Sequence, residues 1–409
     1  MKTKIYYFIT IVILSFLSNS SIIAKNSPSL VDNADDFYLF EHAIDLYDAG
    51  QYEEALKIYE SLKPKYPTEY CIPAEIALTL NTMGRYKEAL KIIKPVYNKY
   101  EAPLYTTYAT SLANLGKTKQ AEKILKEGIK KFPQFGLFYL DLGKLDLQKD
   151  KPYAALNNFQ KTMEYMPNIS ESYYYAAPIE FQSNDSIKEP IWGLIYAETE
   201  VLLNPGDDRK NYQMSRDMVN CYYRYCFGDG DTLNVYLTTE PYFGFQSDKD
   251  DPNNLWYKPN CGWVLAGCYR VAMKQMKEQN IPVDMTSLSS LTTFRRLMVE
   301  NYFTLTDAIF GNSMYLPIFQ KKIIDAGHWD AYNCFLFQSV FESQTKEWLD
   351  QHPDEMAAFV KWYLDGNNLK LDAEHRVYKD NLYMTVKKKI PLKEIESFRA
   401  LFGKNYIPE

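Results

Sequence analysis

Apolar and polar residues repeat over residues 36–167 with the period of helices that pack in pairs. Four units follow one another, each made of two amphipathic stretches joined by a short polar turn. The units share a small residue in each stretch and a glycine or aspartate in the turn. These residues are Ala43, Ala77, Ala109 and Gly143 in the first stretches, Ala55, Ala89, Ala121 and Ala155 in the second, and Gly50, Gly84, Gly116 and Asp150 in the turns. Small side chains let two helices approach closely, and glycine or aspartate permits a tight turn, so the pattern predicts four helical hairpins.

The alanines of the second stretches recur after 34, 32 and 34 residues. This period and the small-residue positions resemble the tetratricopeptide repeat (TPR). The resemblance implies an all-α fold in which residues 36–167 form an α-solenoid of four TPR helical hairpins. In such a solenoid each hairpin buries its faces against its neighbours, and one extended surface stays available to a partner.

The apolar pattern continues less regularly beyond the four repeats. Residues 168–227 are predicted to form a degenerate fifth repeat, whose first helix Pro178 interrupts, and a capping helix. Residues 228–409 are predicted to be an irregular, mostly helical C-terminal region. Its elements are expected as helices at 263–279, 291–305, 316–326, 331–341 and 353–364, with a short hairpin or extended segment at 232–245. Two segments, 191–205 and 319–333, are similar to secreted TPR proteins of Gram-negative bacteria.

The first 24 residues have the pattern of a secretory signal peptide. Lys2 and Lys4 precede an apolar run over residues 5–17, and Ala24 offers a cleavage site. The run is short for a membrane span, although an uncleaved N-terminal anchor is the alternative. The first cysteine is Cys71, so no cysteine stands where a lipoprotein anchor needs one. We therefore expect a periplasmic or secreted protein with no transmembrane span in the mature chain.

The net charge and the motifs that the chain lacks exclude several classes of function. The formal net charge is −6, and lysines are interspersed with acidic residues, so no basic stripe predicts a nucleic-acid partner. The chain has only four histidines and lacks the phosphate-loop, dinucleotide and metalloprotease motifs. We therefore expect no cofactor, no metal and no enzymatic activity. Six cysteines in an exported chain allow disulfides, but their connectivity stays open.

The repeat register predicts a peptide-binding surface on the first helix of each hairpin. Aromatic and aliphatic residues would anchor a peptide there, and amide and hydroxyl groups would bond its backbone. The predicted binding residues are Phe37, Phe40, Ile44, Tyr47, Asn81, Thr106, Thr110, Asn114 and Lys144. Phe40 and Ile44 occupy first-repeat positions where TPR receptors of chaperone tails carry a basic and asparagine clamp, so a chaperone C-terminus is not the expected partner. The alternatives are a repeat surface with no dedicated ligand and a scaffold that docks an envelope complex.

A cysteine enzyme is a third possibility. Residues 260–284 resemble the cysteine-helix segment of transglutaminase-like enzymes, which implies Cys261 as nucleophile, His328 as base and Asp330 as orienting acid. That family places its histidine and aspartate on neighbouring β-strands, whereas the residues around His328 have helical periodicity. Residues 327–331 instead resemble the hairpin turn at 50–55. We therefore expect Cys261 to be a small apolar residue of a packed helix.

Overall fold

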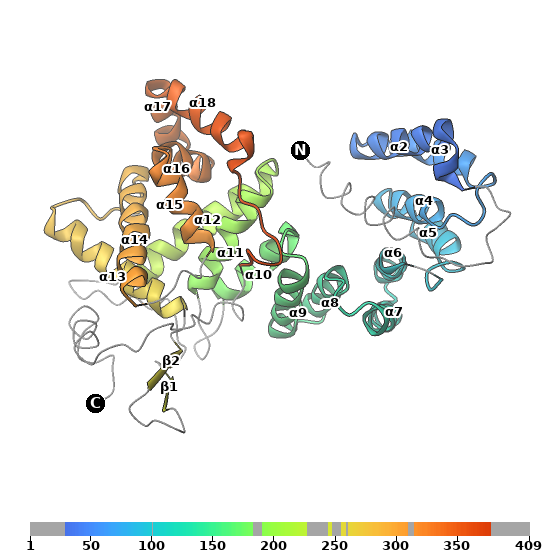
Figure 1. The fold of residues 1–409 in the computed structure, drawn as a ribbon, viewed down its shortest axis with the longest axis horizontal. Helices are drawn as coiled ribbons and strands as arrows, with labels where there is room; N and C mark the ends of the chain where they lie inside the picture. The colour runs from blue at the N-terminus through green and yellow to red at the C-terminus, as the bar shows by residue number, and fades with distance from the viewer. Residues whose placement is uncertain are drawn as a thin grey trace. The chain divides into compact units, whose positions relative to one another are not determined.

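The computed structural model describes residues 29–99, 101–182, 190–226, 244–247, 255–258, 261–309 and 315–377. The chain divides into two units, Met1–Asn158 and Phe159–Glu409, whose helices are labelled in Figure 1. The predicted signal peptide, residues 1–24, and the tail from residue 378 lie outside the described residues. Within the described part, no helix has the length and apolar character needed to cross a membrane.

The first unit is built from helical hairpins, after a short 3-10 helix η2 (Leu30–Asp32). The first helices of the hairpins are α2 (Ala34–Asp48), α4 (Cys71–Thr82), α6 (Ala102–Asn114) and α8 (Leu137–Gln148). The second helices are α3 (Tyr52–Leu62), α5 (Tyr86–Ile93), α7 (Thr118–Lys131) and α9 (Pro152–Tyr165). The division between the units falls within α9, after Asn158. The hairpins make the all-α solenoid that the sequence predicts.

Each hairpin turns through one hydrogen-bond pattern. In the first, the Gly50 N–H donates to the Tyr47 carbonyl (2.9 Å) and the Gln51 N–H to the Leu46 carbonyl (2.8 Å). Gly50 has φ +79°, a left-handed conformation that glycine adopts without steric penalty. The same two bonds and a positive φ recur at the other predicted turn residues, Gly84, Gly116 and Asp150. This Schellman geometry ends the first helix and reverses the chain into the second.

Small residues bring the helices of the first unit into close contact. The repeat alanines are all at most 2% exposed, and they comprise Ala43, Ala55, Ala77, Ala89, Ala109, Ala121 and Ala155. At Gly128 a Cβ atom would lie 2.6 Å from the Phe138 ring, so α7 and α8 approach each other through a glycine. One hydrophobic core runs from Leu30 to Leu145. The predicted small residues therefore lie where neighbouring helices of the first unit pack against each other.

The first helices also contact one another along the stack. Helix α4 packs against α6, and α6 packs against α8. The second helices α3, α5 and α7 make no contact of this extent in the described residues. Closer spacing on one side of the stack places the first helices on its inner side.

The second unit starts with a fifth hairpin. Its helices are α10 (Ser170–Gln182) and α11 (Pro190–Leu203), and the Phe181 ring occupies the space that a Cβ atom at Gly193 would need. Helix α10 continues past Pro178, so the predicted interruption is wrong. Helix α12 (Asp208–Cys226), predicted as a cap, packs against α10, α11 and the later helix α16 (Trp329–Phe337).

The remaining helices follow the predicted order with one addition. The predicted hairpin or extended segment at 232–245 lies outside the described residues except for 244 and 245, and the second strand of the ribbon is not predicted from the sequence. The remaining elements are the ribbon β1 (Gly244–Ser247) and β2 (Leu255–Lys258), then α13 (Cys261–Glu278), α14 (Leu288–Ile309), α15 (Tyr315–Asp325), α17 (Glu342–Gln351), α18 (Pro353–Trp362) and η3 (Tyr363–Asn367). The two strands pair antiparallel, with Gly244 opposite Lys258. Helix α17 is the addition: most of its residues are polar and only Thr345 is buried, so it carries little apolar periodicity.

A buried polar network joins four helices of the second unit. The carboxylate of Glu198 on α11 accepts hydrogen bonds from Arg295 of α14 (2.6 Å), Gln320 of α15 (2.7 Å) and the Tyr332 hydroxyl of α16. Arg295 also donates to the Asn333 amide oxygen. The Arg295 side chain is 0% exposed and that of Glu198 is 4% exposed. A buried charge is tolerated only when its partners are in place, so this network fixes how α11, α14, α15 and α16 pack.

Candidate binding surface

The first helices leave a recurring set of side chains partly accessible after the hairpins have packed. We call this set the first-helix face. It consists of Phe37, Ile44, Tyr47 and Asp48 on α2, Cys71, Ala74, Leu78 and Thr82 on α4, Thr106, Thr110 and Asn114 on α6, and Lys144, Leu147 and Gln148 on α8, all half-buried or exposed. The face recurs because one helical register faces inward in every hairpin. It mixes apolar groups with hydroxyl and amide groups.

Most of the predicted binding residues lie on this face. The Tyr47 hydroxyl and the Thr82 hydroxyl share a hydrogen bond of 2.8 Å that links α2 to α4. Thr106 donates to the Pro103 carbonyl (2.7 Å), and the Asn114 amide donates to the Thr110 carbonyl (2.9 Å). These bonds fix the positions of the side chains, but each hydroxyl and amide keeps further hydrogen-bonding capacity.

Two predicted binding residues are buried. Phe40 is 4% exposed, and its ring packs edge-to-face on Tyr59 at 5.6 Å, so it belongs to the core rather than to the surface. Asn81 is 8% exposed, and its amide donates to the Thr107 carbonyl (3.0 Å) while its oxygen accepts from Ser111 (2.7 Å). Asn81 therefore joins α4 to α6, and its expected availability to a peptide is corrected. Its side chain forms hydrogen bonds between α4 and α6, which belong to two neighbouring hairpins.

Charge is segregated between the two sets of helices. The second helices α3, α5 and α7 carry lysines and acidic residues in similar numbers, whereas the first helices carry one lysine, Lys144. The acidic residues of the first helices are Asp35, Asp36, Glu41, Asp45, Asp48, Glu75, Asp141 and Asp146. Asp36 is neutralised by Lys65, whose ammonium lies 2.8 Å away. The first helices therefore carry an excess of carboxylates over lysines.

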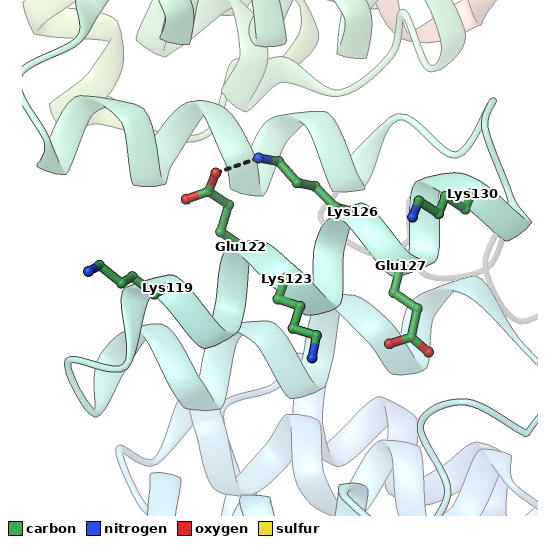
Figure 2. Close-up of a pocket in the computed structure, with 6 residues that line it drawn as sticks. All are labelled: Lys119, Glu122, Lys123, Lys126, Glu127 and Lys130. Atoms are coloured by element: carbon green, nitrogen blue, oxygen red, sulfur yellow. Dashed lines mark hydrogen bonds and ion pairs between the residues drawn. The ribbon is translucent and has the colours of Figure 1, made fainter.

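The opposite side of one hairpin is lysine-rich. Helix α7 presents a shallow surface site lined by Lys119, Glu122, Lys123, Lys126, Glu127 and Lys130, all on one helix (Figure 2). Glu122 bonds Lys126 and Lys149, both at 2.6 Å, and these bonds lower its pKa to about 2. The remaining lysines of this set extend along the helix away from that bridge (Figure 2). Lysines spaced in this way are typical of a solvated helix face.

The described contacts of His328 and Asp330 are with residues outside the predicted Cys261–His328–Asp330 triad. Asp330 pairs with Arg296 (3.1 Å), and the His328 ring packs near the rings of Trp362 (5.3 Å) and Phe359 (6.1 Å). His328 and Asp330 lie at the start of α16 rather than on β-strands. Gly327 has φ +76° and its turn repeats the hairpin hydrogen bonds, as the comparison with residues 50–55 predicts. Cys261 begins α13, and its side chain lies outside the described part.

The described thiols are packed rather than activated. Cys71, Cys221, Cys268 and Cys334 are unbridged, and all but Cys71 are buried. Burial raises the pKa of the Cys268 thiol, and burial raises that of Cys334 to about 11. A thiol with a raised pKa is a poor nucleophile at neutral pH. These four cysteines behave as small apolar residues.

Sequence comparison finds no family model that matches the chain and no curated protein that matches it. Solved structures do match. A thermophilic TPR protein of Thermus thermophilus, TTC0263, is 15% identical, with 45% of this chain and 99% of that chain covered and a TM-score of 0.40. YrrB, a TPR protein with an unusual peptide-binding site, is 16% identical, with 45% and 94% covered and a TM-score of 0.30. MamA from Desulfovibrio magneticus RS-1 is 13% identical, with 43% and 98% covered and a TM-score of 0.33. Over a little under half of its length, the chain is similar to these helical-repeat proteins.

Proposed function

We propose that the first unit is a protein-binding scaffold that holds an extended peptide segment along the first-helix face. The observation that supports this most directly is the recurrence of that face. Two register positions stay accessible in all four first helices, although the hairpins around them are tightly packed. They are occupied by Ile44, Leu78, Thr110 and Lys144, and by Asp48, Thr82, Asn114 and Gln148. A row of apolar side chains and hydroxyl and amide groups suits an extended chain, whose side chains and backbone need both kinds of partner. The second unit is not part of this site.

Selection from a displayed library of random 12-residue peptides tests the proposal, with the purified full chain as the target. Peptides that bind the wild type should bind at least about tenfold more weakly to Thr110→Arg, because a long cation on α6 would block the face. Gln120→Arg is the matched control: it adds the same side chain at an exposed position of α7 and should leave binding unchanged. Fluorescence anisotropy with the selected peptides gives both dissociation constants. Failure to select any binder, or equal binding by Thr110→Arg and the wild type, would reject the scaffold assignment.

We also propose that the scaffold acts outside the cytoplasm, in the cell envelope or beyond it. The support is the charge and hydrophobic pattern of residues 1–24. N-terminal sequencing of the protein from native cells should find a chain that begins at Lys25. An intact Met1 would contradict export with cleavage after Ala24.

A further inference from the structure

Helix α12 of the second unit has one buried side and one exposed side. Its buried residues are Met214, Ser215, Met218, Cys221 and Tyr222. The opposite side carries exposed residues at steps of three or four along the helix, a spacing that places side chains on one face. We call this set the α12 stripe, and it consists of Arg209, Tyr212, Arg216, Asn220 and Tyr223.

The α12 stripe differs in composition from the solvated face of α7. The face of α7 exposes lysines, which are strongly hydrated and need no partner, whereas the α12 stripe exposes arginine and tyrosine. Tyr212 is 44% exposed and Tyr223 is 62% exposed. Tyrosine and arginine are enriched among the residues that carry most of the binding energy of protein interfaces. The composition of the α12 stripe therefore favours a protein partner over solvent.

The guanidinium groups of the α12 stripe keep donors for such a partner. Arg209 forms no ion pair within the described part of the chain. Arg216 bonds one oxygen of Asp217 through its Nε and Nη2 atoms, so Nη1 and one hydrogen of Nη2 remain available. The Arg216 guanidinium also lies 5.7 Å from the centre of the Tyr212 ring. This stacking orients the guanidinium plane before a partner arrives, and less side-chain entropy is then lost on binding.

Charge determines the chemistry of the partner. Helix α12 has two carboxylates against four basic residues, which are Arg209, Lys210, Arg216 and Arg224. Lys210 pairs with Asp207 (3.6 Å) and lies over the Tyr174 ring (5.1 Å), so the arginines are the cations that remain for a partner. Arginine bonds a carboxylate through two parallel N–H donors. An acidic partner therefore matches the α12 stripe in charge and in hydrogen-bond geometry.

We propose that the α12 stripe docks an acidic, extended segment of a partner protein. Arg209 and Arg216 are seven residues apart, which is about 10 Å at the rise of an α-helix. Two residues three positions apart in an extended segment are separated by about 10 Å as well. Each arginine then bonds one carboxylate of the segment, and the exposed rings of Tyr212 and Tyr223 pack against its apolar groups. The site belongs to the second unit and is independent of the first-helix face.

A depleted selection tests the proposal. A displayed library of random 12-residue peptides is first passed over the full-length variant Arg209→Gln/Arg216→Gln and then selected on the wild-type chain. Binders should carry two aspartates or glutamates three positions apart. In fluorescence anisotropy they should bind the double variant at least about tenfold more weakly than the wild type. Changing these carboxylates to amides should weaken binding to the wild type about as much and should not affect binding to the double variant.

Lys119→Gln/Lys123→Gln is the matched control, because it removes two exposed charges from α7. It should weaken binding by less than about twofold, since distant charges are screened. All substituted side chains are exposed, so the unfolding curves of both variants should coincide with that of the wild type. Equal losses in the two variants, or a library from which no binder survives the depletion, would overturn the docking site.

Two further variants separate the parts of the site. Arg209→Lys/Arg216→Lys keeps the charge but loses the paired donors, and it should still weaken binding about fivefold or more. Tyr212→Ser/Tyr223→Ser should weaken binding about tenfold. Full binding by both variants would reduce the α12 stripe to a non-specific cationic surface and overturn the proposal.

The remaining outcomes identify the class of partner and keep the two proposed sites apart. Hexagalacturonate, an acidic oligosaccharide, should compete for the α12 stripe more weakly than the selected peptides do. Stronger competition by this oligosaccharide would assign the stripe to a glycan and overturn the protein partner. Thr110→Arg should leave binding of these peptides unchanged, so the scaffold function of the first unit and the docking site on α12 can fail separately.

Discussion

Replacing Arg295 by methionine should lower the free energy of unfolding of the second unit by about 3–5 kcal/mol. The substitution leaves the Glu198 carboxylate buried without its ionic partner, and it removes the donor that Asn333 accepts from. Methionine fills part of the same volume, so the loss reports chiefly the uncompensated charge. All six tryptophans, residues 192, 256, 263, 329, 348 and 362, lie in the second unit. Urea unfolding followed by tryptophan fluorescence therefore measures this unit without a signal from the repeats.

Arg296→Met is the matched control for that experiment. Arg296 is the next residue on α14 and pairs with Asp330, but both side chains are exposed, so its loss should cost at most about 1 kcal/mol. The double variant Glu198→Gln/Arg295→Met removes both charges and should recover part of the stability lost by Arg295→Met. If Arg295→Met and Arg296→Met had equal effects, the buried network would not be what stabilises the packing of these helices.

Glu200→Gln should stabilise the second unit by about 3 kcal/mol at pH 8 and by almost nothing at pH 4. Glu200 is fully buried on α11, and one of its carboxylate oxygens has no hydrogen-bond partner in the described residues. Burial raises its pKa from 4.5 to about 7, against a smaller lowering effect of Lys210. The folded state therefore holds the proton more tightly than the unfolded state does. As pH rises from 4.5 through 7, the wild type loses stability because the folded carboxylate must ionise in the interior.

The measured quantity is the difference in unfolding free energy between Glu200→Gln and the wild type at several pH values. Taking the difference cancels the pH dependence of every other group. Glu278→Gln serves as the control, because Glu278 is exposed and its difference should stay near zero throughout. A Glu200→Gln difference that stayed constant between pH 4 and pH 8 would show that Glu200 is not protonated preferentially in the folded state.

The hairpins of the first unit could be predicted because their geometry depends on local requirements. A left-handed residue is needed at each turn, and Gly50, Gly84 and Gly116 meet that need at no steric cost. A small residue is needed wherever two helices come close, and the alanine period marks those places. The pattern even predicted the turn at Gly327 in the second unit, where the same hydrogen bonds recur.

The candidate binding surface was predictable only in part. Helical periodicity places Phe37 and Phe40 on neighbouring parts of one helix, but it cannot say which ring a following helix will cover. Tyr59 of α3 covers Phe40, and Thr107 and Ser111 of α6 engage Asn81.

The sequence by itself determined the hairpins, their turns and the small-residue seams, because each depends on residues within about one repeat of one another. Tertiary structure alone decided the partners of the buried charges. Glu198 and Arg295 are 97 residues apart, and Tyr332 is 134 residues from Glu198. Nothing in the helical period of α11 distinguishes Glu198, which is bonded by three donors, from Glu200, which has an unpartnered oxygen among the described residues. The difference arises because a buried charge is stabilised by whichever groups the fold brings to it, and those groups come from helices distant in the chain.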